Sequence, residues 1–246
     1  MKKKYALILS IMVVMLIFFN FCFLKKINLI SKREKAIIEK FIDGDTARLK
    51  DGRILRLINI NTPEKKEYGY LEAIEFMSQF EKKEVEIEIM GKDKYNRLLA
   101  RIFVPEYLNL IIVEKGLGNK FLVERNEKKI FAKAEKEAIE KGIGRWNHSE
   151  NFGCLKIKIN QKDEILFLKN ICESELKDLI IKDESRKKFL ISEIKSGEIK
   201  VHSKKGINNE TDIFIGLKED IWNNDKDSVY IFDNKNKIIS YYSYGY

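Results

Sequence analysis

Alternating apolar and polar residues predict strands over the first half of the chain. Apolar positions alternate with polar ones on both sides of Asp51-Gly52 and in 84–90, and further strands are expected over 34–42 and 96–104. Apolar residues at helical spacing predict helices over 68–82, 108–115 and 124–141. Five strands with interspersed helices favour an α+β barrel of the oligonucleotide-binding (OB) class, which we assign to residues 34–148.

After a boundary near residues 146–153, the pattern becomes all-β. Short apolar runs are separated by turn-forming residues, without helical spacing, which is typical of a β-sandwich. We assign this second domain to residues 152–246. The expected strands are 155–159, 165–168, 179–181, 194–201, 213–215, 228–232 and 238–244.

The N-terminus, residues 1–26, has the pattern of a targeting segment. Three lysines precede an apolar run from residue 5 to residue 24, and two more lysines follow it. The run is long for a cleaved signal peptide and about long enough to span a bilayer. We predict an uncleaved signal anchor, a transmembrane helix that holds the protein outside the cytoplasm. A cleaved signal peptide and secretion are the alternative.

Composition and charge indicate the class of protein but not its function. Charged residues make up 35% and hydrophobic residues 44% of the chain, which is typical of a globular protein. The net charge is +9, but residues 1–31 hold five lysines and no acidic residue, so over half of the excess lies there. Any affinity of the two domains for nucleic acid must therefore come from local placement of charge. Cys154 and Cys172 either pair, if the domain is exported, or remain two buried free thiols.

The candidate chemistry lies in residues 41–64. Asp43 and Asp45 occupy a tight turn, and Asn61-Thr62-Pro63-Glu64 ends the strand after Asp51-Gly52. Period-two alternation places Arg56 on one face with three isoleucines, so its guanidinium needs an anionic partner. Carboxylate and amide oxygens suit Ca²⁺, and an arginine beside such a cation suits a phosphate. The alternative is that these acids are ordinary turn residues.

Motifs in this half of the chain resemble the staphylococcal nuclease (thermonuclease) family. The motifs are IDGDT at 42–46, RLxxxxTPE at 56–64, YGxxEA at 68–73, DKYxRxLA at 93–100, EKGL at 114–117 and GxGRW at 142–146. The resemblance implies a five-stranded OB-fold barrel with three helices. It also implies a Ca²⁺-dependent phosphodiesterase that acts on DNA and RNA and leaves 3′-phosphate products.

The resemblance assigns roles residue by residue. Asp45 and the backbone carbonyl of Thr62 correspond to Ca²⁺ ligands. Glu64 corresponds to the carboxylate that activates or positions the attacking water. Arg56 and Arg97 correspond to the arginines that hold the phosphate and stabilise the charge of the transition state.

Asn61 departs from this pattern, because the family often has an aspartate as a second Ca²⁺ carboxylate at this position. An amide oxygen can ligate Ca²⁺ but brings no charge, so we expect metal binding in the weaker range of about 10⁻⁴–10⁻³ M. The tyrosines that would stack on a nucleotide are also absent, because Leu122 and Glu124 lie near those places. Base stacking should therefore contribute less to substrate binding.

Residues 154–246 resemble the lamin-tail domain, an immunoglobulin-like β-sandwich found in bacterial secreted nucleases. The resemblance rests on ILFLKN at 165–170, KSGE at 195–198, IWNNDKDSVYIFD at 221–233 and SYYSY at 240–244. The family has no recognised catalytic residues, so we interpret this domain as a binding, spacing or targeting module with a cell-surface or protein partner.

Together these observations predict an extracytoplasmic, membrane-anchored, monomeric nuclease. The alternative is a protein whose nuclease fold is catalytically weakened or inactive and which binds nucleic acid or a surface, a possibility that Asn61 raises.

Overall fold

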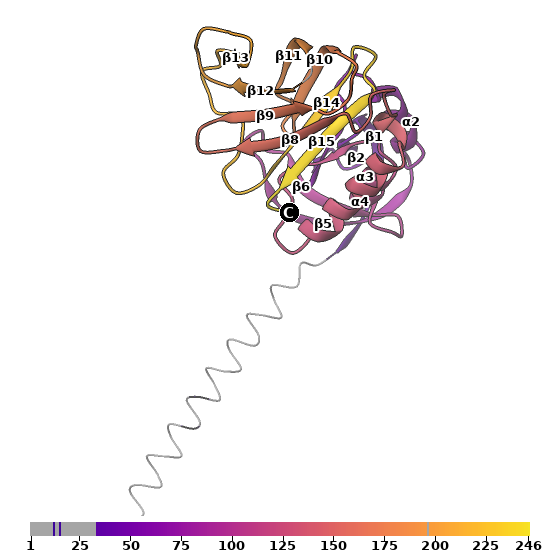
Figure 1. The fold of residues 1–246 in the computed structure, drawn as a ribbon. Helices are drawn as coiled ribbons and strands as arrows, with labels where there is room; N and C mark the ends of the chain where they lie inside the picture. Colours follow the sequence, from indigo (N-terminus) through magenta and orange to yellow (C-terminus); the bar gives the residue numbers. More distant parts are fainter. Residues whose placement is uncertain (1–11, 13–14, 16–32, 196) are drawn as a thin grey trace, which may run out of the picture.

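Five strands of the N-terminal half close into a barrel, as the alternation predicts (Figure 1). The computed structural model describes Met12, Met15 and residues 33–195 and 197–246. The strands follow the order β1-β2-β3-β6-β5, in which β3 and β6 are parallel and the other pairs are antiparallel. Their bounds are β1 Glu34–Asp43, β2 Thr46–Leu49, β3 Ile54–Leu57, β5 Glu84–Lys92 and β6 Leu98–Phe103.

Three α-helices of the described residues accompany the barrel and cover its core. They are α2 (Tyr70–Ser78), α3 (Leu108–Glu114) and α4 (Lys128–Glu140), and a 3₁₀ turn, η1 (Gly144–Trp146), follows α4. Met77 of α2, Ile112 of α3 and Phe131 of α4 lie in one buried cluster with the inward residues of the strands. The five-stranded barrel and its three helices are therefore confirmed, although α2 and α4 are shorter than their apolar patterns.

The alternation within residues 54–60 predicted the wrong buried face. The strand ends at Leu57, Asn59 adopts a positive φ of 69°, and β4 (Ile60–Asn61) then pairs with β7 (Asn119–Lys120). Leu55 and Leu57 are fully buried in the core, so Arg56 points to the opposite side of β3. On that side it lies next to the carboxylate of Asp45.

Eight strands of the C-terminal half form two four-stranded sheets. One sheet has the order β11-β10-β14-β15 and the other β13-β12-β9-β8. Buried residues of both sheets, such as Ile181 and Leu168, belong to one apolar cluster, so the two sheets form a sandwich. The bounds are β8 Leu155–Asn160, β9 Ile165–Asn170, β10 Leu176–Asp183, β11 Lys188–Ile194, β12 Gly197–His202, β13 Asp212–Phe214, β14 Asp227–Phe232 and β15 Ile238–Tyr244.

The expected single strand over 194–201 is wrong. β11 ends at Ile194 and β12 begins at Gly197, whose φ is 108°. Because glycine adopts this conformation without a Cβ penalty, the chain leaves one sheet here and enters the other. The sequence was interpreted as one apolar run, so the break between the two strands was not predicted.

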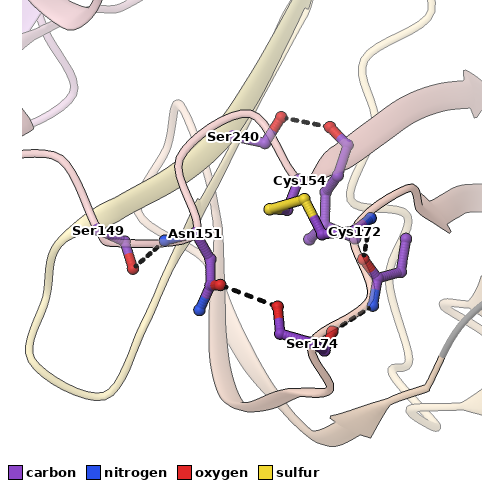
Figure 2. The surroundings of a disulfide bond; sticks show 8 residues. Ser149, Asn151, Cys154, Cys172, Ser174 and Ser240 are labelled. Carbon is purple, nitrogen blue, oxygen red and sulfur yellow. Dashed lines mark hydrogen bonds between the residues drawn. A yellow bond between two sulfur atoms is a disulfide. The ribbon is translucent and has the colours of Figure 1, made fainter.

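A disulfide joins Cys154 and Cys172, so pairing is the alternative that the structure supports (Figure 2). It links the start of the sandwich to the loop after β9 across a sequence separation of 18 residues. The Ser174 hydroxyl donates to the Asn151 side chain beside it, at 3.1 Å. The disulfide therefore fastens the segment that connects barrel and sandwich.

The barrel and the sandwich share an apolar cluster. Trp146 of η1 is fully buried and lies 5.1 Å from the ring of Tyr230 and 6.0 Å from that of Phe232, both on β14. Ile139 of α4 and Ile238 of β15 belong to the same cluster. The C-terminal residue, Tyr246, also contacts the barrel core. The two parts therefore hold a fixed relation through buried contacts.

The predicted transmembrane helix, and the membrane attachment that follows from it, are corrected here. In the part of the chain that the structure describes, no helix is long and apolar enough to cross a membrane. The longest of these helices, α4, has 13 residues, whereas a span needs about 20. The predicted signal anchor at residues 1–26 lies outside the described residues, apart from Met12 and Met15.

Candidate phosphodiester site

The acidic turn between β1 and β2 forms the floor of the site. The Asp45 carboxylate is buried and accepts hydrogen bonds from the Thr62 N–H at 2.9 Å and from the Thr62 hydroxyl at 3.3 Å. A Cβ on Gly44 would lie 2.7–2.9 Å from the Thr62 side chain. Glycine is therefore required for the turn to approach the β4 end of the site so closely.

Arg56 finds the anionic partner that its burial requires. Its Nη2 lies 3.4 Å from the Asp45 carboxylate and also donates to the Ile60 carbonyl, at 2.9 Å, and to the Asn61 side-chain oxygen, at 2.5 Å. Burial lowers the pKa of Arg56, and the positive charges of Arg97 and Arg186 add to this effect against the attraction of Asp45. Arg97 and Arg186 therefore lie close enough to Arg56 to affect its charge.

Arg97 approaches the same turn from the start of β6. Its Nε donates to Asp93 at 2.8 Å, and its Nη1 lies 3.5 Å from the Thr46 hydroxyl. Asp93 also accepts the backbone N–H groups of Tyr95 and Arg97. The turn thus aims the Arg97 guanidinium at the acidic turn, next to Asp45.

Glu64 and the Thr62 carbonyl meet a residue that the sequence analysis did not identify. Arg186, on the turn between β10 and β11, places its Nη1 2.6 Å from the Glu64 carboxylate and 3.2 Å from the Thr62 carbonyl oxygen. It lies 124 positions from Thr62 in the sequence and belongs to no quoted motif, so no local signal could have found it. All six predicted site residues therefore lie together, with an added arginine.

Asn61 joins the barrel to the sandwich. Its side-chain N–H donates to the Glu184 carbonyl at 3.0 Å, while its side-chain oxygen accepts from Arg56. Asn119, its partner in β7, donates to the same carbonyl at 3.2 Å. A carboxylate at position 61 has no N–H to donate, so the amide is explained by this contact.

The oxygens expected to bind Ca²⁺ are already engaged by donors. Asp45 accepts from Thr62 and pairs with Arg56, Asn61 accepts from Arg56, and the Thr62 carbonyl accepts from Arg186. Within the described ranges, no group of three or more His, Cys, Asp or Glu side chains could hold a metal ion. A hard cation needs several free oxygens and net negative charge. As arranged here, these residues do not fit a resident Ca²⁺.

A buried ionic network lies behind the site, where β7 meets the sandwich. Lys120 is fully buried, and its Nζ lies 2.5 Å from Glu135, 2.6 Å from the Ser228 hydroxyl and 3.6 Å from Glu184. The Glu184 carboxylate also accepts from the Tyr246 hydroxyl at 2.6 Å. Lys120 belongs to none of the sequence motifs, and only the three-dimensional contacts reveal its role.

Glu184 should make stability depend on pH. Burial raises its pKa from 4.5 to about 7, although Lys120 and Tyr246 oppose the shift. The folded state then binds more protons than the unfolded state between about pH 4.5 and pH 7, so stability falls as pH rises through this window. Urea denaturation of the wild type and of Glu184→Gln should show a weaker fall in the variant, and the exposed Glu198→Gln serves as control. Equal pH dependence in all three proteins would contradict this assignment.

Comparisons with known proteins agree with this geometry. Residues 54–148 match the family described as "Staphylococcal nuclease homologue". A protein of Escherichia coli described as "Uncharacterized endonuclease" is 27% identical over an alignment of 118 positions, and the match covers 46% of this chain and 77% of that protein. One of Haemophilus influenzae with the same description is 30% identical over 115 residues, 44% of this chain and 64% of that protein. An uncharacterized protein of Methanocaldococcus jannaschii is 29% identical, covering 46% of this chain and 72% of its own length.

The matched region contains β3 to η1, and with them Arg56, Asn61, Thr62, Glu64 and Arg97. Motifs, barrel and site therefore lead to one conclusion: the part of the barrel domain from residue 54 to residue 148 is staphylococcal nuclease-like.

Proposed function

We propose that this protein is a nuclease that hydrolyses phosphodiester bonds of DNA and RNA and leaves 3′-phosphate products. The observation that carries the proposal is the grouping of Arg56, Arg97 and Glu64 around the acidic turn at Asp45. The relatives described as endonucleases support it.

The residues suggest a direct hydrolysis. Arg56 and Arg97 bind the phosphate oxygens with their planar forks and stabilise the charge that develops on them in the transition state. Glu64 orients a water molecule and takes its proton as the water oxygen attacks phosphorus. The bond from phosphorus to the 5′-oxygen breaks, and this oxygen leaves as a hydroxyl after gaining a proton from solvent.

Ca²⁺ dependence remains a prediction from the family resemblance, and the engaged oxygens of the site argue against it. Comparing cleavage in millimolar Ca²⁺ with cleavage in EDTA tests it separately from the nuclease activity itself.

The second candidate function is a nucleic-acid-binding protein without catalysis. Two observations favour it: Asn61 brings no charge, and Glu64 is paired with Arg186. In that case, single-stranded DNA binds but is not cleaved.

Glu64→Gln should separate the two functions. If Glu64 handles the attacking water, this change should lower kcat for single-stranded DNA by roughly 10²–10⁴-fold. Because 56% of the Glu64 side chain is exposed, the melting temperature should hardly change. Glu75→Gln, an exposed change on α2, is the matched control. Wild-type protein that binds DNA but never cleaves it would favour the second candidate.

The remaining assignments belong to the same proposal. We place the protein outside the cytoplasm, which the Cys154–Cys172 disulfide supports because such bonds persist in oxidising compartments. We propose domain bounds of 34–148 and 152–246. We also propose that the sandwich is a lamin-tail domain with a cell-surface or protein partner, and that the protein is a monomer. Size-exclusion chromatography with light scattering tests the last of these.

A further inference from the structure

We propose that the sandwich completes the nuclease site, with Arg186 as a third residue that binds the substrate phosphate beside Arg56 and Arg97. This inference rests on the proposed function. It gives the C-terminal part of the chain a role in the reaction in addition to any targeting role.

The position of the guanidinium is the first argument. Arg186 contacts two groups of the segment after β4, the Thr62 carbonyl and the Glu64 carboxylate. Both contacts use Nη1, whereas a guanidinium has five N–H donors. With 33% of its side chain exposed, Arg186 can also bind an anion that enters from solvent.

The backbone of Arg186 is the second argument. Its φ is 75°, a left-handed conformation in which glycine is the easier residue. The turn is held by Asp183, which accepts from the Lys187 N–H at 2.7 Å and from the Ser185 hydroxyl at 2.6 Å. These hydrogen bonds fix the turn and so hold the Arg186 side chain in its position at the site.

The interface shows that Arg186 is a built-in part of the site. The Glu184 carbonyl, two residues away, accepts from Asn61 and Asn119 of the barrel. Trp146 and Lys120 are fully buried between the two parts. Opening this interface would expose an apolar cluster and buried charges, so Arg186 is held at the site permanently rather than as a reversible latch.

Charge supplies the ligand class. Arg56, Arg97 and Arg186 come from three separate segments of the chain. Burial is the main cause of the lowered pKa of Arg56, and the positive charges of Arg97 and Arg186 add to it. Neutral Asn61 leaves this group with less negative charge than an aspartate would. Three guanidiniums at one site favour a ligand with several anionic oxygens, such as the phosphodiester of a nucleic acid.

The test uses the purified full chain with Arg186→Gly and Arg186→Lys. Glycine suits the left-handed φ, so Arg186→Gly should fold. Lys195→Ala, at the opposite end of β11, removes the same charge and is the matched control. The probe is a fluorescent 12-nucleotide oligo-dT, whose binding is measured in EDTA at several salt concentrations, with cleavage measured in parallel.

We expect Arg186→Gly to weaken binding roughly 10-fold to 100-fold. The negative slope of log K against log salt should also become less steep by about 0.7, as expected for one lost phosphate contact to a single strand. Arg186→Lys should keep the slope but recover only part of the affinity, because lysine lacks the fork. The control should match the wild type in both.

Several outcomes would overturn the inference. One is that Arg186→Gly binds the oligonucleotide as the wild type does, with the same salt slope. A second is faster cleavage by this variant, which would mean that Arg186 blocks Glu64. A third is that the wild type does not bind the oligonucleotide. Arg186-dependent binding without any cleavage would overturn the nuclease proposal alone. Cleavage with Arg186-independent binding would overturn only this inference.

Discussion

Replacing Arg97 by alanine is expected to lower kcat for cleavage of single-stranded DNA by roughly 10²–10³-fold, the loss typical of one donor that stabilises a transition-state anion. The guanidinium is aimed at the acidic turn by Asp93, at 2.8 Å, and by its approach to the Thr46 hydroxyl. Removing it deletes positive charge where the phosphate would lie. Steady-state kinetics on a fluorescent oligonucleotide measure the loss.

Stability should hardly change in the same variant. The Arg97 side chain is 31% exposed, and its pair with Asp93 is of the partly solvated kind that contributes about 0–1 kcal/mol. Arg53→Ala is the matched control, because Arg53 also pairs with an aspartate in a turn, Asp51, but lies on the β2–β3 hairpin. If Arg97→Ala keeps a third or more of the wild-type activity, Arg97 does not have the role assigned to it.

The second large effect concerns stability. Lys120→Met should lower the free energy of unfolding by about 3–5 kcal/mol, because removing one partner of a buried ion pair leaves the other charge uncompensated. Here Glu135 and Glu184 would both lose the Lys120 ammonium inside the interface. Chemical denaturation followed by fluorescence measures the change, and we expect one transition because barrel and sandwich share buried contacts.

Lys133→Met supplies the control. Lys133 lies on α4, is 78% exposed and pairs with Glu137 at 3.8 Å, so the same substitution there should cost under about 0.5 kcal/mol. A cost for Lys120→Met no larger than that of the control would refute the interface role. Two separate unfolding transitions in the wild type would also contradict it.

The sequence predicted those features that depend on local patterns. Alternating positions and short apolar runs predicted the strands of the barrel, and the turn at Asp51-Gly52 forms the expected hairpin. The motifs identified the site residues from Asp45 to Arg97, which the fold brings together. The prediction of which face of β3 is buried was wrong, because the positive φ at Asn59 interrupts the alternation that was followed through residues 54–60.

What local patterns could not predict depends on contacts between distant segments. The resemblance predicts that Asn61 is a weak metal ligand, but no local pattern predicts that its amide donates to the Glu184 carbonyl, 123 positions away. Lys120 and Arg186 belong to none of the sequence motifs, and only the fold brings Lys120 into the interface and Arg186 to Glu64. The β4–β7 pair was missed because two-residue strands leave no periodic signal.

The most direct test of the nuclease account is mass spectrometry of a single-stranded DNA oligonucleotide incubated with the purified protein. We predict fragments that end in 3′-phosphates and begin with 5′-hydroxyls, formed by the wild type and almost absent with Glu64→Gln. An intact oligonucleotide after prolonged incubation with folded wild-type protein, with Ca²⁺ and with EDTA, would contradict the account.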